Sequence, residues 1–464
     1  MLKRLGISTF IKKGFSEDDD KTPLRRFVEN MDWLLISAVV FLISVGLMTV
    51  FSATLHYGNA GKFFTTQLAA VVIGLTGLLL FQSVDYQLYR RGSYLLYGLS
   101  ILMLVLVLVV GTTVRGTKGW FNMGYFSFQP VEVAKITFIL MLASYMDQYW
   151  RVIKRWQSLM IPMLLLLGHL MLILMQPDFS STLVYFPITI ILLYVAGAEP
   201  LYLFALMLFG SLAMGIPLMA TFFKLQPLFM KAHPTIMYFV KATAGGWPAV
   251  ILLGSIVSGL MILWWFLHEL RIRIPLMSVL ILCGIIVGGS ISSGIVQKSL
   301  KDYQRKRLIV FLNPEIDPLG SGYNIIQSKI AIGSGRLFGK GLFSGTQSQL
   351  GFLPEQHTDF IYSVIGEETG FGVSLITIFF YFLLVWRAAI VAREARDRFG
   401  SLIATGIATM FAFYAVINIG MVMGLMPATG LPLPILSYGG SSMVSALWTI
   451  GILMSVHIRR FTHY

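Results

Sequence analysis

Residues 33–53 read WLLISAVVFLISVGLMTVFSA and contain no charged side chain. A helix of about 20 apolar residues is long enough to cross the hydrocarbon core of a bilayer, so this stretch predicts a transmembrane helix. Residues 1–30 before it are polar, with the acidic run Glu17–Asp20. They lack the apolar core and small-residue cleavage site of a signal peptide. We therefore expect a cytoplasmic N-terminal tail and a first helix that stays in the membrane.

Similar apolar stretches recur along the whole chain. Of its 464 residues, 56% are hydrophobic and 12% are charged, whereas soluble domains carry roughly 25% charged residues. This composition predicts an all-α polytopic membrane protein, a bundle of about twelve transmembrane helices. The predicted spans are 33–53, 63–82, 94–111, 129–146, 158–175, 181–197, 201–223, 248–267, 275–296, 360–386, 402–424 and 437–457.

The distribution of basic residues predicts the orientation. With the N-terminus inside, the inside segments carry 20 of the 35 Lys and Arg residues, and the short outside loops carry six. Cytoplasmic loops hold the excess of positive charge in membrane proteins. Retention of loops and contact with anionic lipid therefore explain the net charge of +14, and we expect no nucleic-acid partner.

Four regions follow from these spans. Residues 1–30 form the tail, 31–197 hold the first six helices, 198–274 hold an additional helical region, and 275–464 hold the rest. The last region includes a large extracytoplasmic loop, 297–359. Loops of this length are usually functional. Within it, residues 323–332 could form a short amphipathic helix at the membrane surface.

The end of this loop, residues 345–360, reads GTQSQLGFLPEQHTDF. We expect Asp359 in the first turn of the following helix, and Glu367 and Glu368 about 12 Å deeper. Ionisable residues at membrane depth are costly and usually face an interior cavity. His357 beside them strengthens the prediction of a functional site.

The structural alternative is that Asp359 or Glu355 only caps the helix, since carboxylates favour helix N-termini. A second cluster has the same ambiguity. Glu132 and Lys135 share one helix face because they are three residues apart. They are either a neutralised pair or the lining of a cavity, and the sequence leaves both open. Asp178, after Gln176 and Pro177, could cap the next helix.

Cations on the outer side are not explained by topology, and guanidinium and ammonium groups suit a pyrophosphate. Contact with lipid headgroups is the alternative. The cations concerned are Arg115, Lys118, Lys301, Arg305, Lys306, Arg307, Arg336 and Lys340. The glycine cluster at 333–341 fails the P-loop pattern, because Ser334 and Gly341 stand where glycine and Ser or Thr are required.

Near the C-terminus, residues 432–441 are rich in proline and glycine and include Ser437. Such residues interrupt helices, which membranes tolerate only against protein or water. We expect a re-entrant segment that lines a cavity. The single cysteine, Cys283, lies in an apolar run and is expected to be a small core residue.

Together these segments resemble the RodA/FtsW (SEDS) family, most closely its RodA branch. The resemblance rests on residues 128–135 (FQPVEVAK), 176–178 (QPD), 302–305 (DYQR), 322–323 (GY), 345–360 and 434–441 (PILSYGGS). They span most of the chain in the family's order, and the run at 345–360 is highly specific.

The resemblance implies a peptidoglycan glycosyltransferase that polymerises lipid II during cell elongation and cell-shape maintenance. It implies residence in the bacterial cytoplasmic membrane, a class B penicillin-binding protein as partner, and other elongation-complex proteins. It places the catalytic carboxylate at Asp359 and the important helix pair at Glu132 and Lys135. As candidate cavity or substrate residues we add Lys118, Asp178, Arg305, Arg307, His357, Glu368 and Ser437.

Two departures from the family stand out. Members usually have ten helices, and the two surplus helices fall in 198–274. The family's Leu-Gly-Thr after the QPD motif is replaced by the stretch from Phe179 to Thr182. Two other functions remain open: a lipid II flippase, and a non-catalytic scaffold for a penicillin-binding protein. No metal-ligand spacing is visible, and a divalent cation, Mg²⁺ or Mn²⁺, is an alternative to a purely protein-based site.

Overall fold

The computed structural model describes residues 31–58, 60–114, 116–122, 124, 127–224, 227–243, 245–272, 274–299, 310 and 321–461. Its main helices are α3 (Trp33–Thr54), α4 (Ala60–Ser83), α5 (Tyr86–Val110), α6 (Pro130–Gln148), α7 (Met160–Met175), α8 (Phe179–Ala196), α9 (Pro200–Lys224), α10 (Pro227–Ala232), α11 (Pro234–Thr243), α12 (Trp247–Glu269), α13 (Leu276–Ser299), α15 (Ser321–Gly335), α16 (Thr346–Gln349), α17 (Ile361–Glu394), α18 (Arg398–Val422) and α19 (Gly440–Ile458). Short 3₁₀ turns lie at Leu55–Tyr57, Trp156–Leu159 and Arg459–Phe461.

Every one of the twelve predicted spans forms a helix. Among the described residues, eleven helices are long and apolar enough to cross a membrane. The remaining predicted span, 129–146, is α6. This helix is 19 residues long and mostly buried although it carries Glu132, Lys135 and Asp147. The chain is therefore a multi-pass membrane protein, as the composition predicted.

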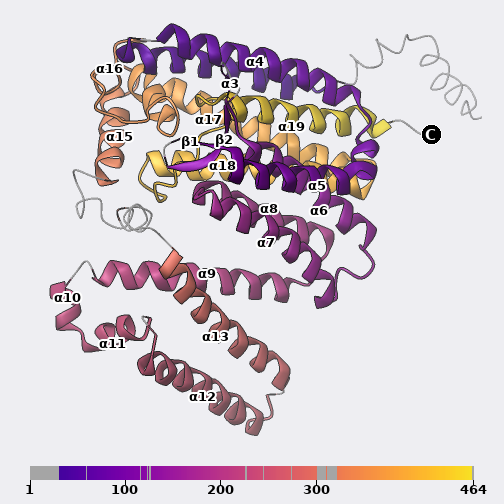
Figure 1. Cartoon of the computed structure of the whole chain (residues 1–464), viewed down its shortest axis with the longest axis vertical. Helices are drawn as coiled ribbons and strands as arrows, with labels where there is room; N and C mark the ends of the chain where they lie inside the picture. Colours follow the sequence, from indigo (N-terminus) through magenta and orange to yellow (C-terminus); the bar gives the residue numbers. More distant parts are fainter. Residues whose placement is uncertain are drawn as a thin grey trace, which may run out of the picture.

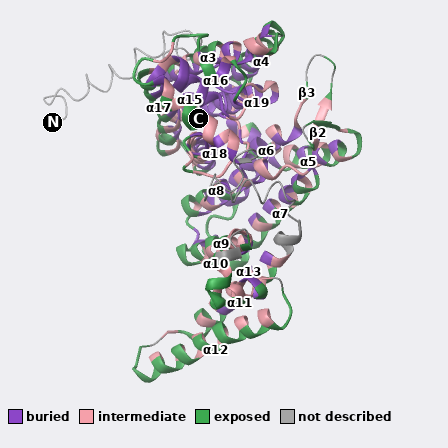
Figure 2. Cartoon of the chain, turned by 90° about the vertical axis from the view of Figure 1, so that its left-hand side faces the viewer, coloured by how far each residue is buried: buried purple, intermediate pink, exposed green. Residues whose placement is uncertain are grey.

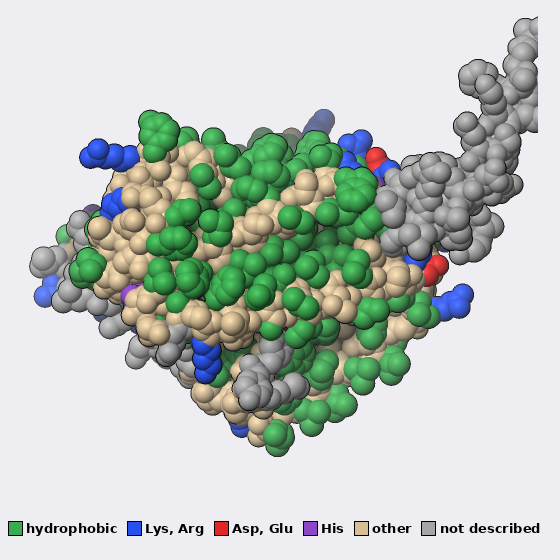
Figure 3. Space-filling model, turned by 90° about the horizontal axis from the view of Figure 1, so that it is seen from above, with side chains coloured by type: hydrophobic (Ala, Val, Ile, Leu, Met, Phe, Trp, Pro, Cys, Tyr) green, Lys and Arg blue, Asp and Glu red, His purple; other side chains and the backbone are tan. Residues whose placement is uncertain are grey.

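The main bundle is built around α19, the most buried of the candidate spans. It packs along α4, while α17 lies between α3 and α18 (Figure 1). Helix α18 also packs against α8 and α6, and α6 against α5. The buried residues gather in this part of the molecule (Figure 2). Viewed from above, hydrophobic side chains cover much of the surface and Lys and Arg lie mostly toward its two ends, as expected for a lipid-facing belt (Figure 3).

Helices α9 to α13 form an arm that extends away from the bundle (Figures 1 and 2). Within the arm, α9 packs on α13, and α12 on α11 and α13; α8 joins the arm to the bundle. No residue of α12 is buried. An apolar helix whose side chains are not buried by protein is stable only in lipid, which agrees with a transmembrane position. The predicted additional region 198–274 corresponds to α9–α12, and its status as an addition to the family's helices stays a prediction.

A small antiparallel sheet between α5 and α6 was not predicted. Its strands are β1 (Thr112–Val114), β2 (Thr117–Asn122) and β3 (Ser127–Phe128), paired in the order β1-β2-β3. The turn between the first two strands contains Gly116 at φ 82°, a conformation that favours glycine. The stretch is too short and polar to cross a membrane, so hydrophobic periodicity gave no signal for it.

The glycine cluster at 333–341 has a structural role. Helix α17 is broken at Gly370 (φ 73°, ψ −170°), which frees backbone groups. The chain after α15 satisfies them: the Phe371 N–H donates to the Arg336 carbonyl at 2.8 Å. A Cβ atom at Gly339 would lie 2.1 Å from the carbonyl oxygen of Glu368. Only glycine allows this approach, so the cluster docks the loop onto the break in α17.

Helix α5 begins eight residues earlier than predicted. Asp85 caps it by accepting a hydrogen bond from the Gln87 N–H at 2.9 Å. Arg90 and Arg91, which were expected in an inside loop, therefore lie on the second turn of a helix. Arginines near a helix end can keep their guanidinium groups in water while the helix continues into lipid, so the prediction of a loop was wrong there.

Candidate active site

Asp359 lies in the turn that leads into α17. The helix begins at Ile361 with Phe360 as its N-cap, so the prediction that Asp359 occupies the first helical turn is wrong by two residues. The Asp359 N–H donates to the Glu355 carbonyl at 3.1 Å, and its own carbonyl accepts from the Asn418 side chain at 2.9 Å. These bonds continue the turn instead of the helix. The residue is half-buried.

The N-cap position of α17 is occupied by Phe360, whose side chain makes no hydrogen bond to the helix, and capping by Asp359 or Glu355 stays an alternative prediction. Glu355 adopts φ 55°, a conformation that few residues other than glycine take. Its carbonyl accepts from the N–H groups of both Thr358 and Asp359. Strained backbone of this kind concentrates at functional sites, where the surrounding structure enforces it.

His357 connects this turn to the other elements around it. Its side chain is buried among aromatic rings, 5.6 Å from Tyr57, 5.3 Å from Phe63 and 5.6 Å from Tyr438 between ring centroids. Its backbone carbonyl accepts from the Tyr438 N–H at 2.8 Å. His357 therefore holds the turn against the chain segment that precedes α19.

That segment, residues 423–439, begins nine residues before the predicted interruption at 432–441 and ends where α19 starts, at Gly440. Asn418 donates a second hydrogen bond to it, at 2.7 Å to the Leu431 carbonyl. Ser437 accepts the Leu433 N–H at 2.8 Å. Gln67 of α4 donates to the Ser437 carbonyl and accepts from the Gly439 N–H, both at 3.1 Å. Residues 431–437 are thus mostly buried in the bundle, as membrane burial of irregular backbone requires, while Met423 and Leu425 at the start of the segment are exposed.

The predicted Glu132–Lys135 pair lines a small cavity behind this segment. Lys135 donates to Glu132 at 2.6 Å and also to the Tyr414 hydroxyl, while Ser445 donates to the other Glu132 oxygen at 3.2 Å. The cavity has room for about one water molecule. Its lining also includes Pro434 of the 423–439 segment. The pair is therefore neutralised and also lines a cavity, and a role of that cavity in the reaction stays a prediction.

Asp178 caps α8, accepting from the Ser181 N–H at 3.1 Å and the Ser181 hydroxyl at 2.7 Å. It also accepts from the Gln129 side chain at 3.1 Å. Burial raises the pKa of Asp178, and the bonds from Ser181 oppose that rise. Gln129 in turn donates from its backbone to Ser441 of α19 at 3.0 Å. The two family motifs at 128–135 and 176–178 therefore meet at the N-terminal ends of α6 and α8.

Glu367 and Glu368 form a buried clamp below the turn. Glu367 accepts from the backbone of Gln347 at 2.8 Å and Ser348 at 3.0 Å, and from the Lys340 ammonium at 2.9 Å. Glu368 accepts from the Ser52 hydroxyl at 2.5 Å. The clamp therefore ties the end of the long loop to α17 and α3. It explains why two carboxylates occur in an apolar helix without being exposed to lipid.

Of the outer cations, Lys118, Arg336 and Lys340 lie within the described residues. Lys118 lies on β2, half-buried, with its ammonium 3.2 Å from the Val109 carbonyl. Arg305 and Arg307 fall outside the described residues, as does Arg115. Within the described residues, no three His, Cys, Asp or Glu side chains gather to hold a metal ion. Any divalent ion at the described carboxylates would have to take ligands from substrate as well.

The sequence interpretation missed Asn418, Gln67 and Tyr414. Each is a polar side chain within an apolar span, and each is buried against the irregular segment or the Glu132–Lys135 pair. Buried amides in a membrane helix require a partner. An isolated amide inside a predicted span was therefore an available signal for Asn418 and Gln67.

Comparison with known proteins identifies the family of the chain. The sequence profile of the FtsW/RodA/SpoVE family, described as cell cycle proteins, matches residues 31–245 and 249–461. The chain is 35% identical to the peptidoglycan glycosyltransferase RodA of Treponema pallidum (strain Nichols), over 94% of this chain and 99% of that protein. It is 31% identical to the peptidoglycan glycosyltransferase MrdB of Escherichia coli (strain K12), over 92% and 95% of the two chains.

Solved structures give the same result for the fold. A structure described as structural coordination of polymerization and crosslinking by a peptidoglycan synthase complex matches with a TM-score of 0.63 and 27% identity, over 93% of this chain and 99% of that one. The crystal structure of the rod shape determining protein RodA of Thermus thermophilus matches with a TM-score of 0.56 and 24% identity, over 93% and 98%. The chain therefore belongs to the FtsW/RodA/SpoVE family.

Proposed function

We propose that this chain is a peptidoglycan glycosyltransferase that polymerises lipid II into glycan strands during cell elongation, with Asp359 as the general base. One observation carries the assignment of Asp359. It is the half-buried carboxylate of a strained turn that Asn418 and His357 fix against the 423–439 segment, and it precedes the N-cap residue Phe360 of the helix behind it. The names of the relatives, peptidoglycan glycosyltransferases, supply the reaction class.

The reaction needs one base. A hydroxyl of the acceptor sugar attacks the anomeric carbon of the donor sugar. The new glycosidic C–O bond forms while the bond from that carbon to the pyrophosphate oxygen breaks. The hydroxyl proton passes to the Asp359 carboxylate, and polyprenyl pyrophosphate leaves with the bonding electron pair. Inverting transfer requires a base only on the attacking side, and such a base typically contributes about 10²–10⁴-fold in rate.

Cations must balance the charge of the leaving pyrophosphate. Lys118, on the strand next to the α6 and α8 termini, is the described candidate, and Arg305 and Arg307 are candidates from the long loop. Mg²⁺ is commonly held by one or two carboxylates plus substrate phosphates. Asp359 together with the substrate could hold such an ion, whose role would be to neutralise the pyrophosphate. The direct protein contact and the ion remain alternatives in this proposal.

The proposal includes location and partners. A cytoplasmic N-terminus in the bacterial inner membrane puts the turn at Asp359 on the outer side, where the substrate would be used. A class B penicillin-binding protein is the proposed partner, together with other elongation-complex proteins. The solved complex described as coordinating polymerization and crosslinking supports a crosslinking partner. The RodA name of the Treponema pallidum relative supports elongation over division.

The test uses purified chain, with its penicillin-binding partner, and lipid II in a gel-based polymerisation assay. We expect Asp359→Asn to reduce strand synthesis by about 10²-fold or more. Glu199→Gln, an exposed carboxylate at the start of α9, is the control and should be fully active. Normal synthesis by Asp359→Asn would remove Asp359 from catalysis.

Further outcomes separate the other functions. A flippase would move lipid II across vesicles without lengthening it, and a scaffold would tolerate Asp359→Asn while failing after changes at its partner interface. The cavity at Glu132 and Lys135 does not favour a lipid pathway, because it holds about one water molecule and its charges are paired. We therefore keep polymerisation as the proposed function.

A further inference from the structure

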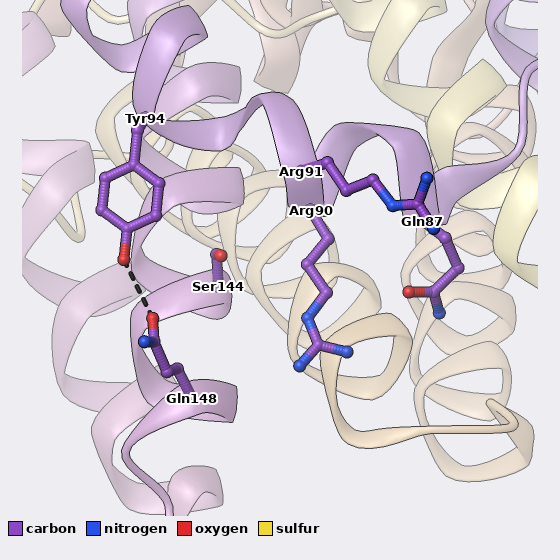
Figure 4. Close-up of a pocket in the computed structure, with 6 residues that line it drawn as sticks. All are labelled: Gln87, Arg90, Arg91, Tyr94, Ser144 and Gln148. Atoms are coloured by element: carbon purple, nitrogen blue, oxygen red, sulfur yellow. Dashed lines mark hydrogen bonds between the residues drawn. The ribbon is translucent and has the colours of Figure 1, made fainter.

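A hollow on the described surface lies at the opposite end of the bundle from Asp359's turn, between the start of α5 and the end of α6. It measures about 560 Å³. Figure 4 shows its lining residues, which come from these two helices only. They are Gln87, Arg90, Arg91, Tyr94, Ser144 and Gln148. Two of the six carry a positive charge and none carries a negative one.

The two arginines differ in what they contact. Arg90 forms an ion pair with Asp147 at 2.5 Å, which fixes its guanidinium while leaving its side chain 44% exposed. Arg91 is exposed and makes no hydrogen bond or ion pair with a described residue. A guanidinium presents five N–H donors and cannot lose its charge. Arg91 therefore brings an unneutralised, strongly donating group to the hollow.

Among the neutral residues, Gln148 adds a donor from α6, the helix opposite the two arginines. The Tyr94 hydroxyl donates to the Gln148 carbonyl oxygen at 3.0 Å, which leaves the Gln148 NH₂ group available (Figure 4). The Gln87 NH₂ group donates a hydrogen bond to the Asp397 carboxylate. The combined chemistry selects an anion with several oxygen acceptors, such as a phosphodiester.

The surroundings indicate where that anion comes from. Apolar residues on α5 next to the hollow face outward, with Leu88 58% and Leu95 69% exposed. Trp150 and Trp156 are exposed nearby in sequence, as aromatic residues are at membrane interfaces. A free phosphate would make no use of this apolar surface, whereas the acyl chains of a phospholipid would lie along it. Basic hollows between helices at the cytoplasmic surface suit anionic lipid headgroups.

We infer that this hollow binds the headgroup of an anionic phospholipid, with the phosphodiester between Arg90 and Arg91 and the acyl chains along α5. The binding site does not depend on the reaction at Asp359. Its assignment to the inner leaflet rests on the proposed orientation with a cytoplasmic N-terminus. In that orientation it tethers α5 and α6 at the end of the bundle remote from the substrate.

The test is a titration of the full-length protein in neutral detergent. The melting temperature of the protein is measured at each ligand concentration. The ligands are dihexanoylphosphatidylglycerol, dihexanoylphosphatidylcholine and inorganic phosphate. We expect a saturable rise in melting temperature with phosphatidylglycerol only. Arg91→Gln should weaken its apparent affinity about fivefold, from the loss of one basic group. Arg396→Gln, another exposed arginine with no contact to a described residue, is the matched control and should behave like the parent.

Arg91→Gln does not break the Arg90–Asp147 pair, so this variant should fold. Equal responses of the two variants would overturn the proposal. A full response to inorganic phosphate would also overturn it, because the site would then recognise a free anion. The acidic run Glu17–Asp20 is the competing occupant within this chain. If neutralising that run were required before any lipid response appeared, the tail would be the occupant and the lipid assignment would be wrong.

Discussion

The side-chain amide of Asn418 donates to the backbone carbonyl of Asp359 at 2.9 Å, and to that of Leu431 at 2.7 Å. One residue on α18 thereby fixes both the turn that carries the proposed base and the irregular segment in front of α19. Asn418 is fully buried, so water cannot replace its bonds. The position of the Asp359 backbone therefore depends on a residue of α18 that is itself shielded from solvent.

Replacing Asn418 should impair catalysis as well as folding. Asn418→Ala leaves two carbonyls without this donor, at a cost of about 1–3 kcal/mol for each that stays unsatisfied. We expect strand synthesis to fall about 10–100-fold, because small displacements of a catalytic group are expensive. The measurement is the initial rate of polymerisation beside the melting temperature. Thr409→Ala, which removes a bond within α18 only, is the control; equal losses in both variants would contradict a positioning role.

The Glu132–Lys135 pair allows its structural and catalytic roles to be separated. Lys135→Met should destabilise the protein by about 3–5 kcal/mol, because it leaves a buried carboxylate without its cation. Adding Glu132→Gln should recover much of that stability, since no unpaired charge then remains. If the cavity serves the reaction, activity will stay low in the stable double variant. Recovery of both stability and activity would show that the pair is only structural.

Loss of the Glu367 charge should loosen the end of the long loop. Its carboxylate accepts the N–H groups of Gln347 and Ser348 and pairs with Lys340. Hydrogen bonds to a charged group contribute about 1.5–3 kcal/mol each. For Glu367→Gln we expect faster hydrogen–deuterium exchange in residues 345–350, with little change in α4 or α19. Uniformly faster exchange along the chain would instead indicate general destabilisation.

A glycine on α3 should be intolerant of substitution. A Cβ atom at Gly46 would lie 2.8 Å from the Ile435 carbonyl oxygen and 2.9 Å from that of Leu436. Both contacts are to backbone, which cannot rotate away as a side chain does. Gly46→Ala should therefore displace the 423–439 segment and lower both melting temperature and activity. Gly98→Ala on α5, where a Cβ atom meets nothing within 4 Å, should be neutral; a neutral Gly46→Ala would contradict the close packing.

Hydropathy predicted all twelve long helices because burial in lipid acts on each segment separately. A span such as 33–53 needs only enough consecutive apolar residues to cross the bilayer, and this is a local property. The error at α5 has the same origin. Arg90 and Arg91 are polar locally but belong to a helix, and composition alone does not show that their side chains extend to water.

The candidate site was predicted in part. The sequence shows polar residues beside or within apolar spans at 345–360 and at Glu132 and Lys135. Such residues are expected to face the interior of the bundle, so the sequence was sufficient to select them. Which of them meet was decided by packing. Gln67 and Ser441 bring together segments separated by more than 300 residues, and Asn418 joins segments 59 residues apart. The clamp at Glu367 and the docking of 335–341 onto Gly370 likewise depend on contacts between distant elements.

The sequence by itself thus determined that the chain is a membrane-embedded helical bundle with buried carboxylates, because the transfer of each residue into lipid depends on that residue and its neighbours. Only the tertiary structure decided that Asp359 stands in a turn fixed by Asn418, outside the helix it was expected to begin. Hydrogen bonds between segments require particular distances and angles, and those exist only after the helices have packed.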